Sequence, residues 1–221
     1  MFRNVTGFLL LLVLLNACSG IKDLPKYQLN DGIYEFKQHP DRYKKVFVYV
    51  ADDTMSIYLK EKIAEPFIPD RLKDQFFLKR SFDVDVMTIP FKFRPAIGNM
   101  PRQLTTDFNG NIFIGYRIDR FRISYKETPI GVKQINKHRG LSIGGFGGLG
   151  STSITPSTTN NQVADEYSGF ILNRGLAVMV GVNNLTVGIG IGWDYLTDRD
   201  KNAWIYQNKP WYGLTVGLNL N

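Results

Sequence analysis

The stretch "NNLTVGIGIGWDYL" (residues 183–196) decides the fold, because its two alternating faces have opposite character. Side chains along a β-strand point to opposite faces with a period of two. One face carries large apolar residues: Leu185, Val187, Ile189, Ile191, Trp193 and Tyr195. The other face carries Thr186, Gly188, Gly190, Gly192 and Asp194. Soluble sheets place polar side chains on the wet face, so this pattern predicts an apolar face toward lipid and a small face toward a narrow lumen.

Similar alternation recurs through the second part of the chain and predicts a set of antiparallel strands. The predicted strands cover residues 82–93, 112–118, 141–150, 175–182, 185–195 and 211–220. The alternation slips at Asp119 and Arg120, where Phe121, Ile123 and Tyr125 take over, so we expect a bulge or turn there. Two of these candidates, Leu185–Tyr195 and Tyr212–Leu220, have the roughly 9–11 residues that a tilted transmembrane strand needs.

The connections between these strands follow the outer-membrane barrel pattern. Asn183 and Asn184 form a tight two-residue turn, whereas loops 151–166 and 196–210 are long and polar. Short turns on the periplasmic side and long loops outside are typical of this class. Six aromatic residues around the last loop predict an interfacial girdle: Trp193, Tyr195, Trp204, Tyr206, Trp211 and Tyr212.

The fold class predicted from these strands is all-β. We expect a small antiparallel up-and-down β-barrel of six to eight strands, preceded by a short hairpin-containing segment. Eight strands are expected if that hairpin joins the barrel. A soluble barrel or sandwich with the apolar row as its core is the alternative, but it would leave rows of glycine facing water.

The N-terminus predicts export and a lipid anchor. Residues 1–17 have one cation and a short apolar run, which is typical of a cleaved signal peptide rather than of a membrane-spanning helix. The motif Leu15-Asn16-Ala17-Cys18 resembles the bacterial lipobox, in which the cysteine is acylated, for example with palmitate. Cys18 is the only cysteine, so no intrachain disulfide competes for it.

Composition divides the mature chain into two predicted regions, 18–80 and 81–221. Residues 22–97 hold 26 charged side chains and residues 140–221 only 9, whereas 18 of the 21 glycines follow Ile97. In the first region we expect strands at 33–37 and 45–50, a hairpin into 55–59 and a short helix near 70–76. The net charge of +7 falls to +6 without residues 1–17, a modest excess that is compatible with anionic lipid headgroups, and no nucleic-acid partner is expected for an exported chain.

Two longer motifs carry a family resemblance. The stretches "SFDVDVMTIPFKFRP" (residues 81–95) and "WIYQNKPWYGLTVGLNLN" (residues 204–221) resemble Bacteroidota outer-membrane β-barrel-type lipoproteins over about residues 80–221. The resemblance implies the architecture and an outer-membrane location. It implies no activity and no catalytic residue.

Catalytic chemistry finds little support in the sequence. His39 and His138 both lie in polar, turn-like settings, and His138 is expected in a 127–139 connection at the periplasmic end. A barrel hydrolase would need His138 to meet a serine such as Ser142. The glycine-rich run at 144–151 lacks the Lys-Ser/Thr ending of a phosphate-binding loop, so it is predicted to be strand. No catalytic, cofactor or metal site is predicted.

Charged residues on the inward face predict an ion network in the lumen. Asp83 and Asp85 share one strand face, and Arg117 and Asp194 are also expected to point inward. Paired carboxylates can act as acid and base or bind Ca²⁺, but ion pairing within a closed lumen is the favoured interpretation.

The sequence therefore predicts a lipid-anchored outer-membrane barrel that acts as a non-enzymatic scaffold or binding protein. Its expected partners are outer-membrane lipid, contacted by acylated Cys18 and the barrel exterior, and an unidentified envelope protein. Loops 97–108, 151–166 and 196–210 are the expected contact surface. A barrel enzyme acting on lipid or glycan is the first alternative, and a tethered lipocalin-like carrier is the second.

Overall fold

The computed structural model describes residues 29–38, 42–51, 54–59, 62–67, 73–182 and 185–220. The predicted signal peptide, Cys18, His39 and the Asn183-Asn184 turn lie outside the described residues. The strands are β1 (Gly32–Gln38), β2 (Lys44–Ala51), β3 (Thr54–Leu59), β4 (Lys62–Phe67), β5 (Gln75–Arg94), β6 (Gln103–Thr105), β7 (Asn109–Thr128), β8 (Gly131–Ile154), β9 (Tyr167–Val182), β10 (Leu185–Leu196) and β11 (Pro210–Asn219). No helix in the described ranges is long and apolar enough to cross a bilayer.

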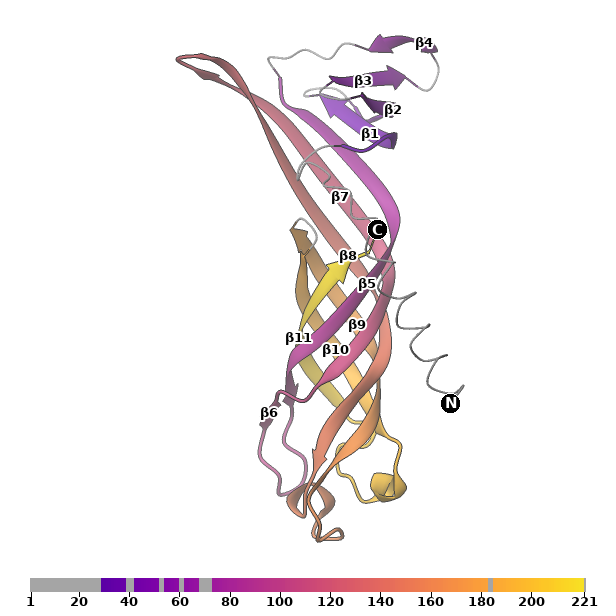
Figure 1. Ribbon diagram of the computed structural model, residues 1–221, viewed down its shortest axis with the longest axis vertical. Helices are drawn as coiled ribbons and strands as arrows, with labels where there is room; N and C mark the ends of the chain where they lie inside the picture. Colours follow the sequence, from indigo (N-terminus) through magenta and orange to yellow (C-terminus); the bar gives the residue numbers. More distant parts are fainter. Residues whose placement is uncertain are drawn as a thin grey trace, which may run out of the picture.

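Six long strands form a closed antiparallel ring (Figure 1). Neighbours in sequence pair in the order β5, β7, β8, β9, β10 and β11, and β11 then pairs with β5 to close the ring. The predicted all-β barrel is confirmed. The N-terminal hairpin does not join the barrel wall, so the ring has six strands and not eight.

Strand β10 has the two faces that its sequence predicts. Ile189 is 71% exposed on the outside, whereas Thr186, Gly190 and Asp194 are buried in the lumen. The glycines are a steric requirement of so narrow a ring, because neighbouring strands approach closely where they coil. A Cβ at Gly188 would overlap the backbone carbonyl of Val178.

Strand β5 changes its inward phase once. Asp83, Asp85, Met87 and Ile89 point inward, after which the buried positions become Lys92 and Arg94. The register between β5 and β11 shifts at this point, as a β-bulge would cause. Pro90 lies within the shift, where its missing N–H costs no ladder hydrogen bond.

Strand β7 runs without interruption through Asp119 and Arg120, so the predicted bulge or turn there is wrong. Its pairing with β5 and β8 keeps one register across the whole segment. The polarity of the two faces inverts instead: the outward row changes from Ile118 to Arg120, while the inward row becomes apolar at Phe121. Beyond this level the exposed outward side chains of the strand are charged, as at Arg120 and Arg122.

Strand β8 also extends further than predicted. Residues 131–139 pair with β7, so His138 lies in a strand and not in a connection. The chain turns at Pro129 and Ile130, and the two strands project as a long hairpin beyond the barrel (Figure 1). The glycine-rich run at 144–151 lies within β8, as predicted.

A small sheet of β1–β4 covers the same end of the barrel, and we call it the cap (Figure 1). It is joined to the barrel by pairing of β1 with the first residues of β5, which crosses the expected region boundary at residues 80 and 81. Its core comprises Leu29, Tyr34, Phe36, Val46, Val48, Ile57, Phe77 and Ile123. The predicted β2–β3 hairpin is present, and β4 was not expected.

The predicted short helix near 70–76 is not present where the structure describes that range. Gln75 and Phe76 already belong to β5 and pair with β1 and β7. Gln75 and Phe77 are buried against the cap, so tertiary pairing decides the conformation of this charged segment.

The opposite end carries the three long connections, and we call it the loop end. Its loops contain β6 and two short 3-10 helices, Ser157–Thr159 and Arg199–Asn202. The first residues of the expected 151–166 loop belong to β8. An apolar cluster closes the barrel beneath these loops: Ile154, Ile171, Leu196, Trp204 and Tyr206.

Candidate functional site

A charged cluster lies in the lumen near the loop end, centred on Asp194. Its carboxylate lies 3.1 Å from the Lys92 ammonium, contacts the Arg94 guanidinium and accepts a 2.9 Å hydrogen bond from Trp211 Nε1. Lys92 also donates to Asn173 Oδ1 at 3.1 Å. Strands β5, β9, β10 and β11 each contribute a residue, so the cluster ties four strands together across the lumen.

Aromatic rings enclose the cations of this cluster. Lys92 Nζ lies 4.8 Å from the Trp211 ring centroid, and the Arg94 guanidinium lies 5.3 Å and 5.0 Å from those of Trp204 and Tyr206. Cation–π contacts of this kind gain strength where water is excluded. They compensate the one excess positive charge that Lys92 and Arg94 together hold over Asp194.

A second charged cluster lies at the cap end of the lumen. Arg117 lies 3.7 Å from Asp83 and 2.9 Å from Asp119, and Asp119 lies 2.7 Å from Nε2 of His138. Ser142 donates a hydrogen bond to Asp83. Asp85, one inward position further along β5, accepts a 2.8 Å hydrogen bond from Thr186.

The structure therefore divides the four residues predicted to form a lumen network. Asp83, Asp85 and Arg117 lie together at the cap end, whereas Asp194 pairs with Lys92 and Arg94 at the loop end. An apolar layer separates the two clusters along the inward face of β5. It comprises Met87, Ile89, Phe113, Phe146, Ala177, Met179 and Trp211.

Sequence reasoning missed several members of these clusters. Lys92 and Arg94 follow the phase change at Pro90, and a proline inside a strand pattern is the signal that could have located it. Asp119 follows Arg117 on one inward row once β7 is read as a single strand. Asn173 precedes the predicted start of its strand and gave no comparable signal.

The pairing that a serine hydrolase would need does not form between the residues considered for it. His138 contacts Asp119 and stacks on Phe121 at 4.4 Å, whereas Ser142 contacts Asp83. Within the described ranges, no group of three or more His, Cys, Asp or Glu side chains is placed to hold a metal ion.

The outer surface of the barrel carries an apolar belt. Its most exposed members come from all six strands: Phe82, Val86, Phe91, Ile112, Ile114, Tyr116, Leu141, Ile143, Leu149, Phe170, Leu172, Leu176, Val178, Val180, Leu185, Val187, Ile189, Tyr212, Leu214 and Leu218. Monomeric soluble proteins rarely expose so large an apolar area.

The predicted aromatic girdle is only half present. Trp193, Tyr195 and Tyr212 point outward, but Trp204, Tyr206 and Trp211 are buried inside the barrel. Trp211 falls on the inward phase of β11, and the loop that carries Trp204 and Tyr206 folds back over Arg94. The cations of the loop-end cluster thus account for the inward placement of these rings.

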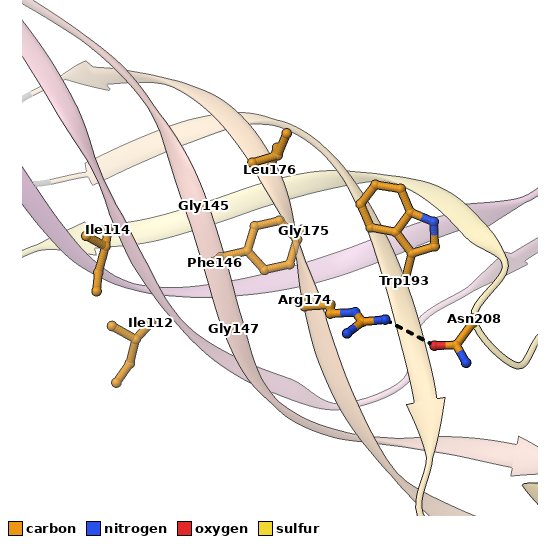
Figure 2. A pocket seen from close by; sticks show the side chains of 10 residues that line it. All are labelled: Ile112, Ile114, Gly145, Phe146, Gly147, Arg174, Gly175, Leu176, Trp193 and Asn208. Carbon is orange, nitrogen blue, oxygen red and sulfur yellow. Dashed lines mark hydrogen bonds between the residues drawn. The ribbon is translucent and has the colours of Figure 1, made fainter.

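An open groove of about 750 Å³ interrupts the apolar belt (Figure 2). The outward row of β8 has glycine at two successive positions, Gly145 and Gly147, which leaves its backbone bare. Ile112 and Ile114 of β7 line one side, and Leu176 and Arg174 of β9 line the other. Trp193 and Asn208 lie beside Arg174, so one part of a largely apolar groove is polar.

Comparison with protein-family models, with curated proteins and with solved structures finds no match to the chain.

Proposed function

We propose that this chain is an outer-membrane lipoprotein whose closed barrel acts as a non-enzymatic scaffold at the cell envelope. The observation that carries the proposal is the inverted polarity of the barrel, with an exposed apolar belt outside and buried ion clusters inside. A lipid environment makes this arrangement favourable, because apolar side chains meet acyl chains while the lumen pairs its charges.

The arrangement of the two ends supports a defined orientation. The cap, the last residues of β9 and β11 and the first residues of β10 lie at one end, and the three long loops lie at the other. In the outer-membrane pattern the loop end is extracellular and the cap end periplasmic. Leu29 in the cap follows Cys18 by eleven residues, so a lipid anchor in the periplasmic leaflet is within reach of this end.

Exposed apolar side chains at the loop end are suited to binding a partner. Leu104 and Phe108 are 65% and 79% exposed in the connection between β5 and β7. They lie beyond the belt on loops carried by a rigid ring, where binding residues commonly lie. We propose loops 97–108, 151–166 and 196–210 as the surface that contacts an envelope protein.

The two alternatives have less support in the geometry. For an enzyme acting on lipid or glycan, Ser142 and His138 would have to pair with each other, but each has a different carboxylate partner. For a lipocalin-like carrier, the lumen would need space for a ligand, but side chains of the apolar layer and of both ion clusters fill it.

Membrane fractionation and mass spectrometry test the proposal. The wild-type protein should resist extraction from outer membranes by carbonate, and its intact mass should show a chain that begins at acylated Cys18. A Cys18→Ala variant should retain its signal peptide, because cleavage at a lipobox follows acylation. Recovery of wild-type protein in the carbonate-soluble fraction, or a mature chain without acyl mass, would contradict the membrane and anchor parts respectively.

A deletion strain separates the scaffold from the enzyme. Lipid A and phospholipid profiles that match the parent strain support the scaffold, whereas an altered acyl pattern would favour the enzyme. Photocrosslinkers placed at Phe108 and at Ile130 of the β7–β8 hairpin compare the two ends. A specific protein adduct at Phe108 supports the loop surface, and one at Ile130 alone would move the contact to the cap end.

A further inference from the structure

The groove on the outer face lies where large side chains are missing from the apolar belt. Along β8 the outward positions are Ile143, Gly145, Gly147 and Leu149, so two positions without a side chain lie between two large side chains. Gly145 pairs with Ile114 and Leu176, whose exposed side chains stand on either side of the bare backbone. An open groove lined mostly by apolar side chains results.

Arg174 is an exception within that belt. It lies between Leu172 and Leu176 on the outward row of β9, where a charged group facing lipid is unfavourable. Within the described residues, the only hydrogen bond of its side chain goes from Nη2 to Asn208 Oδ1 at 3.4 Å, and no described carboxylate forms an ion pair with it (Figure 2). The guanidinium therefore retains most of its donors for an anionic group.

The surroundings of Arg174 place it at a membrane interface. Trp193 is its direct neighbour on β10, and Asn208 belongs to the polar β10–β11 loop. Tryptophan is enriched at the level of lipid headgroups, where its ring is apolar and its N–H is hydrated. A phosphate at this level would meet the guanidinium, which binds phosphate with two parallel hydrogen bonds.

We propose that the groove binds one membrane lipid with an anionic phosphate headgroup. The phosphate contacts Arg174 beside Trp193, and one acyl chain lies over Gly145 and Gly147 between Ile114 and Leu176. This inference rests on the proposed membrane location. It adds a specific lipid site to a barrel exterior that would otherwise contact lipid without preference.

Native mass spectrometry of the detergent-purified protein tests the site, with palmitoyl-oleoyl phosphatidylglycerol as the probe. Arg174→Gln removes the charge, and Gly147→Leu fills the groove, where a Cβ meets nothing closer than 3.8 Å. Matched controls are Arg102→Gln in an exposed loop and Gly110→Leu, which points outward on β7 with no atom within 4 Å. Diacylglycerol with the same chains and inorganic phosphate separate the contributions of chain and headgroup.

The wild-type protein should retain one phosphatidylglycerol, and each groove variant should weaken its binding about tenfold while both controls bind as the wild type does. Diacylglycerol should bind more weakly, and inorganic phosphate should not displace the lipid. Equal retention by all variants would overturn the site. Equal binding of diacylglycerol would overturn headgroup recognition, and displacement by inorganic phosphate would overturn the acyl-chain contact. If the wild-type protein floats with liposomes but gives any of these results, the lipid site is rejected while the proposed membrane location still stands.

Discussion

The ammonium of Lys92 lies 3.1 Å from the carboxylate of Asp194 inside the barrel, and both side chains are almost completely buried. Buried charges are tolerated only when they are paired, so each residue depends on the other. Asp194 belongs to the stretch whose alternation predicts the barrel. Its ion pair with Lys92 shows that the inward face of this stretch lines the closed lumen.

Removing the Asp194 charge should destabilise the barrel strongly. Asp194→Asn leaves Lys92 and Arg94 buried without a carboxylate, so the free energy of unfolding should fall by about 3–5 kcal/mol. Urea titration of the protein in lipid vesicles, followed by tryptophan fluorescence, measures this. Asp165→Asn, in an exposed loop position, is the matched control. Adding Lys92→Met to Asp194→Asn should recover part of the loss. A urea midpoint of Asp194→Asn equal to that of the wild type would contradict the account of this cluster.

Two lumen glycines on β10 should differ sharply in their tolerance of alanine. A Cβ at Gly188 would overlap the Val178 carbonyl, which is backbone and cannot move aside, so Gly188→Ala should cost about 1–3 kcal/mol or abolish folding. At Gly190 the nearest atoms lie at 3.2–3.4 Å, so Gly190→Ala should change stability by less than about 1 kcal/mol. The same urea titration ranks the pair, and equal costs would show that strand approach is not what selects glycine here.

The filled lumen should not conduct ions as a porin does. The apolar layer and both charged clusters occupy the inward positions of every strand, and small barrels of this kind enclose side chains rather than a channel. Planar-bilayer recordings should show no porin-like conductance steps. The protein is delivered to the bilayer in liposomes, and flotation of these liposomes confirms that it is inserted. Regular steps from inserted protein would be inconsistent with the closed interior.

The cap should lose stability at high pH because of Tyr34. Burial raises the pKa of this phenol from 10.0 to about 12, while its 2.9 Å hydrogen bond to the Asn30 carbonyl and the nearby Asp119 and Asp31 carboxylates act as smaller influences. A raised pKa means that folding favours the neutral phenol. The stabilisation is complete below pH 10 and is lost as the pH rises through 12, by up to about 3 kcal/mol at 1.36 kcal/mol per unit.

Near-ultraviolet circular dichroism of the tyrosines follows this alkaline transition, and comparison of the wild type with Tyr34→Phe isolates the part due to Tyr34. Tryptophan fluorescence reports on the barrel, because all three tryptophans lie in β10, β11 or the loop between them. Tyr34→Phe should flatten the pH dependence of urea unfolding between pH 10 and pH 12. The control Tyr49→Phe removes the hydroxyl of a cap tyrosine that is 47% exposed and should leave the dependence unchanged. Identical curves for Tyr34→Phe and the wild type would exclude Tyr34 as the cause.

The alternation in β10 was sufficient to predict the barrel because each face there has one uniform character. Ile189 and Gly190 differ so clearly that the period of two is unambiguous. In β7 the same period predicted the wrong connection, because the surroundings change along the strand. Ile118 and Arg120 lie on the same outward row but in two different environments. Judged by hydrophobicity alone, this change from an apolar to a charged residue looks like a shift of register.

The candidate site was harder to predict for two physical reasons. At a bulge in β5 the inward positions change from odd-numbered to even-numbered residues. Strict alternation therefore does not predict that Lys92 and Arg94 lie in the lumen, although it does predict this for Asp194. The groove depends on which strand neighbours which: Gly145 and Arg174 are distant in sequence, and only the pairing of β8 with β9 brings them to one surface.

Site-directed cysteine labelling of β10 and β7 in intact outer membranes tests the central claim that the apolar belt faces lipid. Cysteines replace Val187 and Ile189 in the belt and Arg122 on the outward row beyond it, in chains that keep Cys18, whose acylated thiol would not react. A membrane-permeant apolar maleimide should label positions 187 and 189, a charged maleimide should not, and Arg122→Cys should react with the charged reagent. Reaction of Ile189→Cys with the charged maleimide as readily as Arg122→Cys would place the belt in water and contradict the account.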